Sequence, residues 1–232
     1  MSTAEEARRL LAEQQEYYRA RAPEYDEYFL RRGRYDQGAE EKARWFREGE
    51  QVQRALAPGG DVLELAGGTG WWTEHLLRTA DRVTVVDGSL EMMAVNRARV
   101  GADAGRVEYV HADLFEWTPA RTYDAVFFGF WLSHVPPDRF DAFWAMVRAA
   151  LRPGGRAYFV DSLQPATSAP HPTSAEDPDI ALRRLNDGRE FRVVKIFWEP
   201  VALAARLRAL GWSADVRATE RFFVYGSAAP RG

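Results

Sequence analysis

The sequence predicts an α/β fold in which a mostly parallel β-sheet is covered by helices on both faces. Three observations lead to this prediction: short strands alternate with amphipathic helices between about residues 61 and 161, the strands are largely apolar, and the first strand runs into a glycine-rich turn. Strands that are buried on both faces have this composition because neither face meets water. At 232 residues the chain fits one such domain with additions.

Composition narrows the class of protein. A hydrophobic content of 46% with charges of both signs is typical of a globular domain, and the net charge of −3 gives no electrostatic reason to expect nucleic acid as a partner. The absence of cysteine excludes disulfides, thiolate zinc sites and cysteine nucleophiles. No apolar run approaches the roughly 18 residues of a membrane span, and no signal peptide is found. We therefore expect a cytoplasmic monomer or homodimer without a membrane partner.

The N-terminal part of the chain is expected to form a helical cap. Ser2 and Glu5 have capping-box spacing at the start of a first helix, which Pro23 ends. A second helix is expected over 39–57, with aromatic and aliphatic side chains turned inward and a Pro-Gly-Gly sequence after it. The cap, residues 1–57, is richer in aromatic residues than a simple tether requires.

Each strand and helix of the alternating segment, residues 61–161, is predicted from its own residues. Its strands are recognised by short apolar runs and are expected at 61–66, 82–87, 107–110, 123–129 and 156–161. Its helices are expected at 71–79, at 90–100 after Ser89 as the N-cap, and from Pro137 onward.

The alternation of strands and helices stops after Asp161. Residues 162–188 are rich in Pro, Ser, Ala and Asp, and a connection of that length is typical of a lid, a binding loop or disorder. An alternating stretch, a helix and an antiparallel pair are then expected, at 191–198, at 200–210, and at 213–218 with 221–226. We assign residues 58–232 to the core domain, with 162–198 as a substrate-side insertion.

The glycine-rich turn, which follows the strand Val62–Leu65, indicates a ligand site. Glycine tolerates positive φ and lets the main chain approach a ligand, and the helix that follows offers free N–H groups. A dinucleotide fingerprint would have a third glycine or alanine where this chain has Thr73, and no Gly-Lys-Ser/Thr triplet of a phosphate loop is present. The turn therefore favours a nucleotide-type ligand of another kind.

Two carboxylates follow the next strands. Asp87 ends the second strand 19 positions after Gly68, where an α/β sheet presents a carboxylate to a ribose diol, although this spacing suits NAD as well and Asp87 could simply cap a helix. Asp113 follows the third strand and could accept from an exocyclic amine such as that of adenine, with Leu114 packing on the ring, or be an ordinary loop aspartate. Met92 could cover the other ring face or belong to the core.

Taken together, these features resemble the class I S-adenosylmethionine-dependent methyltransferases across about residues 60–160. The motif Glu/Asp-x-Gly-x-Gly-x-Gly is met by Glu64, Gly68 and Gly70, with Ala66 at the first glycine, a departure that costs little if Ala66 keeps a negative φ. The other matching stretches are Asp87, Asp113-Leu114, the fourth strand and Leu151-Arg152-Pro153-Gly154-Gly155.

The resemblance implies a Rossmann-like seven-stranded sheet in the order 3-2-1-4-5-7-6, with strand 7 antiparallel. It implies S-adenosyl-L-methionine as cofactor and S-adenosyl-L-homocysteine as its product, with Glu64 organising the glycine loop near the amino group and Tyr25 as a lid tyrosine. The residues that it assigns to cofactor binding are Tyr25, Glu64, Ala66, Gly68, Gly70, Asp87, Gly88, Met92, Asp113, Leu114 and Phe130.

The end of the fourth strand bears on the substrate. The sequence there is Phe128-Gly129-Phe130-Trp131, not the Asn/Asp-Pro-Pro-aromatic turn of enzymes that methylate nucleobase amines. Only Asp161 could supply a carboxylate for a catechol-type metal site, so we expect no metal. The run from Trp131 to Pro136 resembles the small-molecule branch of the family.

His134 is the candidate catalytic residue. It could act as a general base on a substrate hydroxyl, since its unperturbed pKa suits pH 7, or it could be structural. Tyr18, Tyr28 and Trp131 are candidates for the acceptor pocket, although aromatic stripes at helical spacing often only pack. The arginines around the irregular segment could hold an acidic substrate or form a solvated face; they are Arg183, Arg184, Arg189 and Arg192.

The sequence thus predicts an S-adenosylmethionine-dependent methyltransferase that acts on a small molecule, with oxygen as the expected atom. N- or C-methylation of a small molecule, a non-catalytic cofactor-binding regulatory subunit and an NAD-dependent oxidoreductase are the alternatives.

Overall fold

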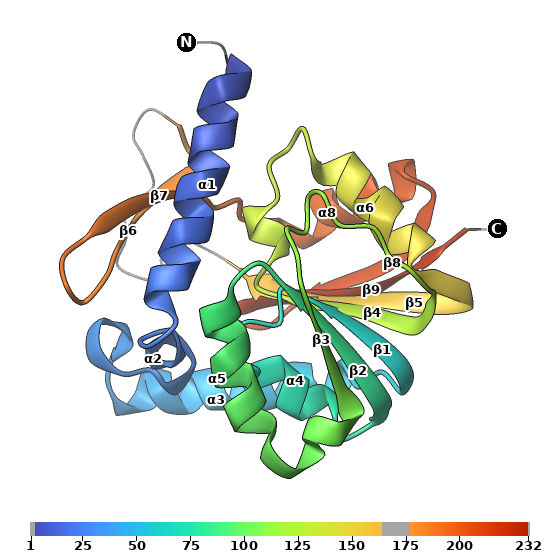
Figure 1. The fold of residues 1–232 in the computed structure, drawn as a ribbon, viewed down its shortest axis with the longest axis horizontal. Helices are drawn as coiled ribbons and strands as arrows, with labels where there is room; N and C mark the ends of the chain where they lie inside the picture. Colours follow the sequence, from blue (N-terminus) through green and yellow to red (C-terminus); the bar gives the residue numbers. More distant parts are fainter. Residues whose placement is uncertain (1–2, 164–176, 232) are drawn as a thin grey trace.

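A seven-stranded sheet forms the centre of the protein in the computed structural model, which describes residues 3–163 and 177–231 (Figure 1). The strand order is β3-β2-β1-β4-β5-β9-β8, and β9 runs antiparallel to its two neighbours. The strands are β1 (Gly60–Leu65), β2 (Ala80–Asp87), β3 (Val107–His111), β4 (Tyr123–Gly129), β5 (Leu151–Ser162), β8 (Trp212–Ala218) and β9 (Phe223–Pro230). Because β6 and β7 form a separate hairpin, β8 and β9 are the sixth and seventh strands of this sheet, and the predicted order 3-2-1-4-5-7-6 is confirmed.

Helices cover both faces of this sheet (Figure 1). One face carries α3 (Ala39–Ala55), α4 (Trp71–Leu76) and α5 (Leu90–Val100), and the other carries α6 (Phe140–Ala149) and α8 (Pro200–Ala209). Successive residues of the central strands feed the two cores: Val62 belongs to the first core and Leu63 to the second, and both are fully buried. This alternation explains why β1 is apolar along most of its length.

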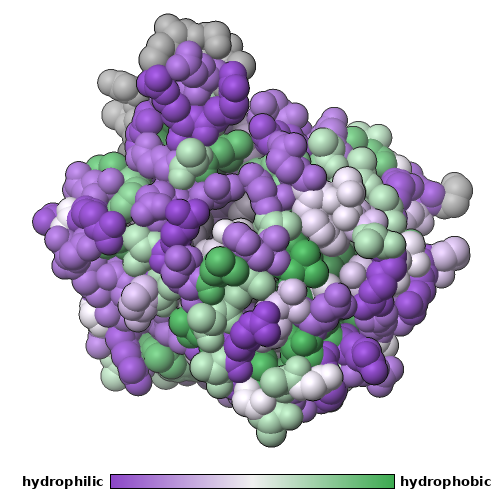
Figure 2. Space-filling model, in the orientation of Figure 1, coloured by the Kyte–Doolittle hydropathy of each residue, from purple (hydrophilic) through white to green (hydrophobic). Residues whose placement is uncertain are grey.

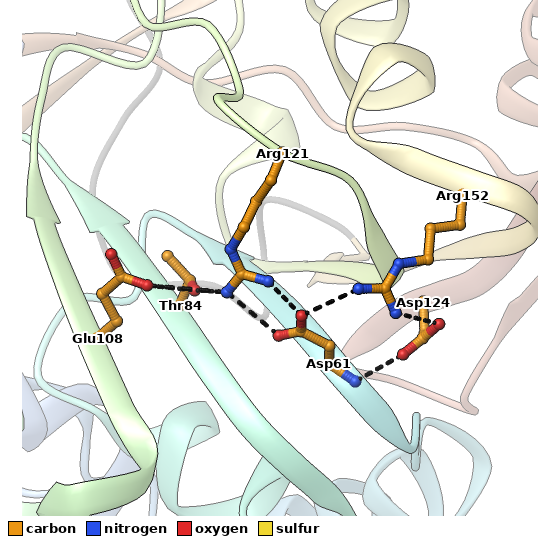
Figure 3. A network of polar contacts seen from close by, with 6 residues as sticks. All are labelled: Asp61, Thr84, Glu108, Arg121, Asp124 and Arg152. Atoms are coloured by element: carbon orange, nitrogen blue, oxygen red, sulfur yellow. Dashed lines mark hydrogen bonds and ion pairs between the residues drawn. The ribbon is translucent and has the colours of Figure 1, made fainter.

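The amino end of the sheet is held by a polar network on the side away from the glycine turn. Its members come from the starts of neighbouring strands and the loops before them (Figure 3): Asp61, Thr84, Glu108, Arg121, Asp124 and Arg152. The Asp61 carboxylate accepts from Arg121 and from Arg152, the latter at 3.3 Å, and its backbone N–H donates to Asp124 at 2.8 Å. The network therefore ties β1 to β4 at the end where no ligand is expected.

The N-terminal helix α1 (Thr3–Arg21) rises from the body of the protein beside a two-stranded hairpin (Figure 1). The hairpin consists of β6 (Ile180–Arg184) and β7 (Glu190–Val194), and β7 lies along α1. Tyr17 packs with Val193 in a small core of its own. The expected alternating stretch over 191–198 is thus shorter than predicted, and its partner strand β6 was not predicted.

Several helix and strand boundaries differ from those predicted. Helix α4 ends three residues early, at Leu76, and α6 begins at Phe140, after the predicted Pro137. Strand β5 was predicted from residue 156, but it already pairs at Leu151 and contains an irregularity before the pairing resumes at Arg156. A short helix, α2 (Asp26–Leu30), follows α1. The proposed cap residue Ser2 and residues 164–176 of the 162–188 segment lie outside the described residues. No described helix is long and apolar enough to span a membrane.

Candidate active site

A cavity of about 740 Å³, counted with its open mouth, lies at the carboxyl ends of the parallel strands. This position is where α/β sheets bind ligands. The surface is hollowed beside α1 at this place (Figure 2). The predicted site residues that line the cavity are Tyr18, Tyr25, Ala66, Gly68, Asp87, Gly88, Met92, Asp113, Leu114, Phe130, Trp131 and His134.

The glycine turn is more strained than the sequence suggested. Ala66 has φ = +54°, so the expectation that it keeps a negative φ is wrong, and the turn holds an L-residue in the left-handed region. Gly70, also left-handed, does not line the cavity: a Cβ there would lie 2.8 Å from Asn96. Gly67, which was not assigned a role, is just as constrained, because its Cβ would lie 2.4 Å from Val85.

Glu64 lies behind this turn and lines a smaller cavity together with Gly67 and Gly68. Its carboxylate accepts from the Thr73 hydroxyl at 2.6 Å, so the residue that breaks a dinucleotide fingerprint serves as a partner of Glu64. Burial raises the pKa of Glu64 to about 8, against the opposing effect of that hydrogen bond. Asn96, which sequence reasoning missed, donates to Thr73 at 2.8 Å and completes the chain of contacts.

Asp87 is held in place by backbone donors. One carboxylate oxygen accepts from Gly68 N–H and the other from Ser89 N–H, both at 2.8 Å, and burial raises the pKa of the carboxyl group. A carboxylate has about four acceptor positions, so two remain for a ribose diol. Ser89 caps α5 as predicted, by accepting from Met92 N–H at 3.1 Å.

Asp113 lies on the exposed side of the cavity. One of its oxygens accepts from Gln15 of α1 at 2.9 Å, and the other accepts from Phe115 N–H at the same distance. Helix α1 therefore contacts the place where an adenine amine is expected. Trp131, a predicted acceptor-pocket residue, lines the first cavity, and its ring centroid lies 5.4 Å from that of Phe115.

Tyr18, which is partly buried, and His134, which is buried, form a pair at the inner end of the cavity. The Tyr18 hydroxyl lies 2.7 Å from His134 Nε2, and His134 Nδ1 lies 2.6 Å from the carbonyl oxygen of Val194. A carbonyl only accepts, so Nδ1 carries the proton and Nε2 accepts from Tyr18. Burial, followed by the positive charge of nearby Lys195, lowers the pKa of His134 well below its usual value, and the imidazole is neutral at pH 7.

A second, smaller cavity adjoins the first. The two share Tyr18, Tyr25, Phe130 and His134, so this second cavity begins where the first ends. Its remaining lining is polar and consists of Arg21, Tyr28, Tyr35, Ser162, Arg183 and Lys195. Tyr28, predicted in the acceptor pocket, lies 3.3 Å from the Ser162 hydroxyl within it.

The second cavity includes residues that were not predicted from the sequence, and it includes one of the four arginines that were considered as a group. Arg21, Lys195 and Ser162 come from separate elements, and no spacing in the sequence connects them. Of the four arginines considered, only Arg183 lines a cavity. The other three are exposed on the outer side of the hairpin: Arg184, Arg189 and Arg192.

Helix α2 is fastened to the glycine turn. Asp26 accepts from the Thr69 hydroxyl at 2.6 Å and forms an ion pair with Arg99, whose Nε donates to the Thr69 carbonyl at 2.8 Å. Tyr25, which precedes Asp26, is thereby held over the first cavity.

Comparison with known proteins accords with this geometry. A sequence model of a methyltransferase domain matches residues 62–155. The chain is similar over nearly its whole length to a solved complex of DhpI with SAH: 45% of residues are identical, 96% of this chain and 97% of that chain are covered, and the TM-score is 0.77. The chain belongs to the class I S-adenosylmethionine-dependent methyltransferases. A DhpI-SAM-HEP complex is similar at 43% identity and a TM-score of 0.78, covering 95% of this chain and 98% of that one.

Curated methyltransferases match a shorter part of this chain than the DhpI structures do. The demethylmenaquinone methyltransferase of Clavibacter sepedonicus is 38% identical over 106 residues, and a ubiquinone/menaquinone C-methyltransferase of Teredinibacter turnerae is 34% identical over 119 residues. These alignments cover 44% and 49% of this chain, and the chain spans less than half the length of either relative (42% and 47%). As a methyltransferase the chain is an enzyme, so the oxidoreductase and regulatory-subunit alternatives are wrong. Among the described residues no group of three or more His, Asp or Glu side chains could hold a metal ion.

Proposed function

We propose that this methyltransferase transfers a methyl group from S-adenosylmethionine to an oxygen atom of a small-molecule acceptor. The observation that carries the proposal is the Tyr18–His134 pair, which lies where the two cavities meet. The first cavity is lined by the residues expected to bind the cofactor, and the second is left for the acceptor.

The residues of the first cavity fit this cofactor. Asp87 has two acceptor positions left for the ribose hydroxyls, Asp113 can accept from the adenine amine, and Glu64 lies behind the turn where the amino group would bind. A cationic amino group beside Glu64 would favour the ionised carboxylate, which the buried site disfavours on its own. When bound, S-adenosylmethionine supplies a methyl group on a sulfonium, which the acceptor atom takes by in-line displacement.

The chain's own contribution to the chemistry lies at His134. Its Nε2 is a fixed acceptor, because the Nδ1 proton is committed to the Val194 carbonyl. An acceptor hydroxyl in the second cavity could replace Tyr18 as the donor to Nε2 and pass its proton there as the oxygen is methylated. Its lowered pKa makes the imidazole a weak base. A hydroxyl needs this base only as the C–O bond forms and the attacking oxygen becomes acidic, whereas an amine bound as an ammonium would have to lose its proton before attack.

The experiment uses S-adenosylmethionine labelled with ¹³C in the methyl group and a panel of small hydroxylated, carboxylated and aminated compounds. The carbon chemical shift of the product tells an oxygen-bound methyl group from one on nitrogen or carbon. Methyl transfer to oxygen supports the proposal. Methyl transfer to carbon or nitrogen, with oxygen acceptors of similar shape left untouched, contradicts it.

A further inference from the structure

Three cationic side chains converge on the second cavity from separate elements. Arg21 ends α1, Arg183 lies on β6, and Lys195 follows β7. All three are buried, with exposed fractions of 8%, 8% and 4%. Placing a charged group in the interior costs several kcal/mol unless a counter-charge accompanies it, so their partners decide what the cavity is suited to bind.

Only Lys195 has a counter-charge. Its ammonium lies 3.1 Å from Asp161 and donates to the Ser133 hydroxyl at 2.8 Å. The Asp161 carboxylate is further occupied by two backbone N–H groups, at 2.7 and 2.9 Å. This part of the cavity is therefore electrically balanced and firmly positioned.

The two guanidinium groups are not balanced. Arg21 donates to the Tyr35 hydroxyl at 3.0 Å and lies 4.7 Å from the centroid of the Tyr25 ring, but these partners carry no negative charge. The Arg183 side chain has no hydrogen bond or ion pair with any described residue, although its backbone belongs to the β6–β7 ladder. His134 adds no charge, so the cavity carries two positive charges more than negative ones.

We propose that the second cavity binds a small oxyanion, and that the acceptor of the proposed methyl transfer is a compact acid anchored by Arg21 and Arg183. Two unpaired guanidinium groups offer several N–H donors to one ligand, the arrangement that recognises carboxylate and phosphate-type groups. The charge count favours a doubly ionised, phosphate-type group over a singly ionised carboxylate. This inference rests on the proposed function, since it names what that function would methylate.

The position of these residues in the chain agrees with a role in choosing the acceptor. Arg21, Arg183 and Lys195 all lie outside residues 62–155, the segment that matches the methyltransferase domain in general. Two of the neighbouring hairpin arginines have partners on the outer surface: Arg189 pairs with Asp187, and Arg192 pairs with Glu6 and Glu13 of α1. Arg183 is thus the hairpin arginine that lines the interior cavity, and its guanidinium group has no carboxylate partner among the described residues there.

Direct binding of inorganic phosphate tests the inference without any turnover. The protein is first saturated with S-adenosylhomocysteine, and phosphate and then acetate are titrated in by calorimetry. We expect saturable binding of phosphate that is tighter than that of acetate. The variant Arg183→Met should weaken phosphate binding about tenfold or more, as should Arg21→Met, because each removes a charged donor.

Arg184→Met is the matched control, since it removes the neighbouring charge of the same strand from the exposed face. It should bind phosphate as the wild type does, and Arg183→Lys should recover part of the loss. Retained affinity for S-adenosylhomocysteine shows that a variant is folded. If Arg183→Met does not fold, the phosphate affinity of Arg21→Met, whose substitution lies on a different element, tests the inference.

Three results would overturn the inference: no saturable phosphate binding to the wild type, equal loss in Arg184→Met, or no loss in the folded Arg183 and Arg21 variants. Acetate that binds as tightly as phosphate would overturn the preference for a doubly charged group. The two proposals fail separately. Phosphate binding with methyl transfer to nitrogen or carbon would refute oxygen methylation alone, whereas oxygen methylation with phosphate binding insensitive to Arg183 would refute the anion site alone.

Discussion

Replacing Glu64 by glutamine should change how the stability of the free enzyme depends on pH. The carboxyl group is 1% exposed, and burial raises its pKa from an ordinary 4.5 to about 8. Between these values the folded protein holds a proton that the unfolded chain has lost. The contribution of this group to the free energy of unfolding is therefore fully present below about pH 4.5. It is lost as the pH rises through about 8, at about 1.4 kcal/mol per pH unit.

The wild type should thus lose about 2–3 kcal/mol more than Glu64→Gln between about pH 5 and pH 7. Glutamine keeps the shape and an oxygen acceptor for Thr73, so the variant removes the titration and little else. Urea unfolding of both proteins at about pH 5, 6, 7 and 8 measures the difference. Glu190→Gln, at an exposed position of β7, is the control and should follow the wild type.

Parallel curves for the wild type and Glu64→Gln would refute the reasoning, because they would mean that the carboxyl group is ionised in the folded protein at pH 5. A second arm adds saturating S-adenosylmethionine. If its amino group binds beside Glu64, the ionised carboxylate gains a partner, and the difference in slope should shrink.

Three other predictions concern different parts of the molecule. His134→Ala should leave the affinity for S-adenosylhomocysteine within about threefold while it lowers turnover about 10²-fold, and unchanged turnover would assign His134 a structural role. Gly67→Ala should lower the free energy of unfolding by about 1–3 kcal/mol, since its Cβ would lie 2.4 Å from a side chain of β2, whereas Gly105→Ala, with nothing within 4 Å, should be close to neutral in thermal melts. Asp61→Asn should cost up to about 1 kcal/mol by weakening the contact with Arg121, with no change in cofactor affinity at the opposite end of the sheet; a weakened affinity would show that the two ends are coupled.

The cofactor side of the site was predictable because its residues follow strand ends at short range. Gly68 and Asp87 are 19 positions apart, and their contact is set by two adjacent parallel strands. The left-handed Ala66 was not predictable, since alanine gives no sign of positive φ and only the surrounding turn imposes it.

The lining of the second cavity was less predictable, because its contacts join distant parts of the chain. Tyr18 and His134 are 116 positions apart, and Val194, whose carbonyl fixes the imidazole, is a further 60 positions away. Arg21 ends a helix with an arginine, which favours the helix dipole in any protein and so gave no functional signal. Which of the hairpin arginines points inward depends on the register of β6, a strand that the sequence did not reveal.

The end of α1 and the start of α2 border both cavities at once. Tyr18 and Tyr25 line both cavities, and the contact of Asp26 with Thr69 and Arg99 fastens them over the glycine turn. A movement of this one segment would therefore change the walls of both cavities at once.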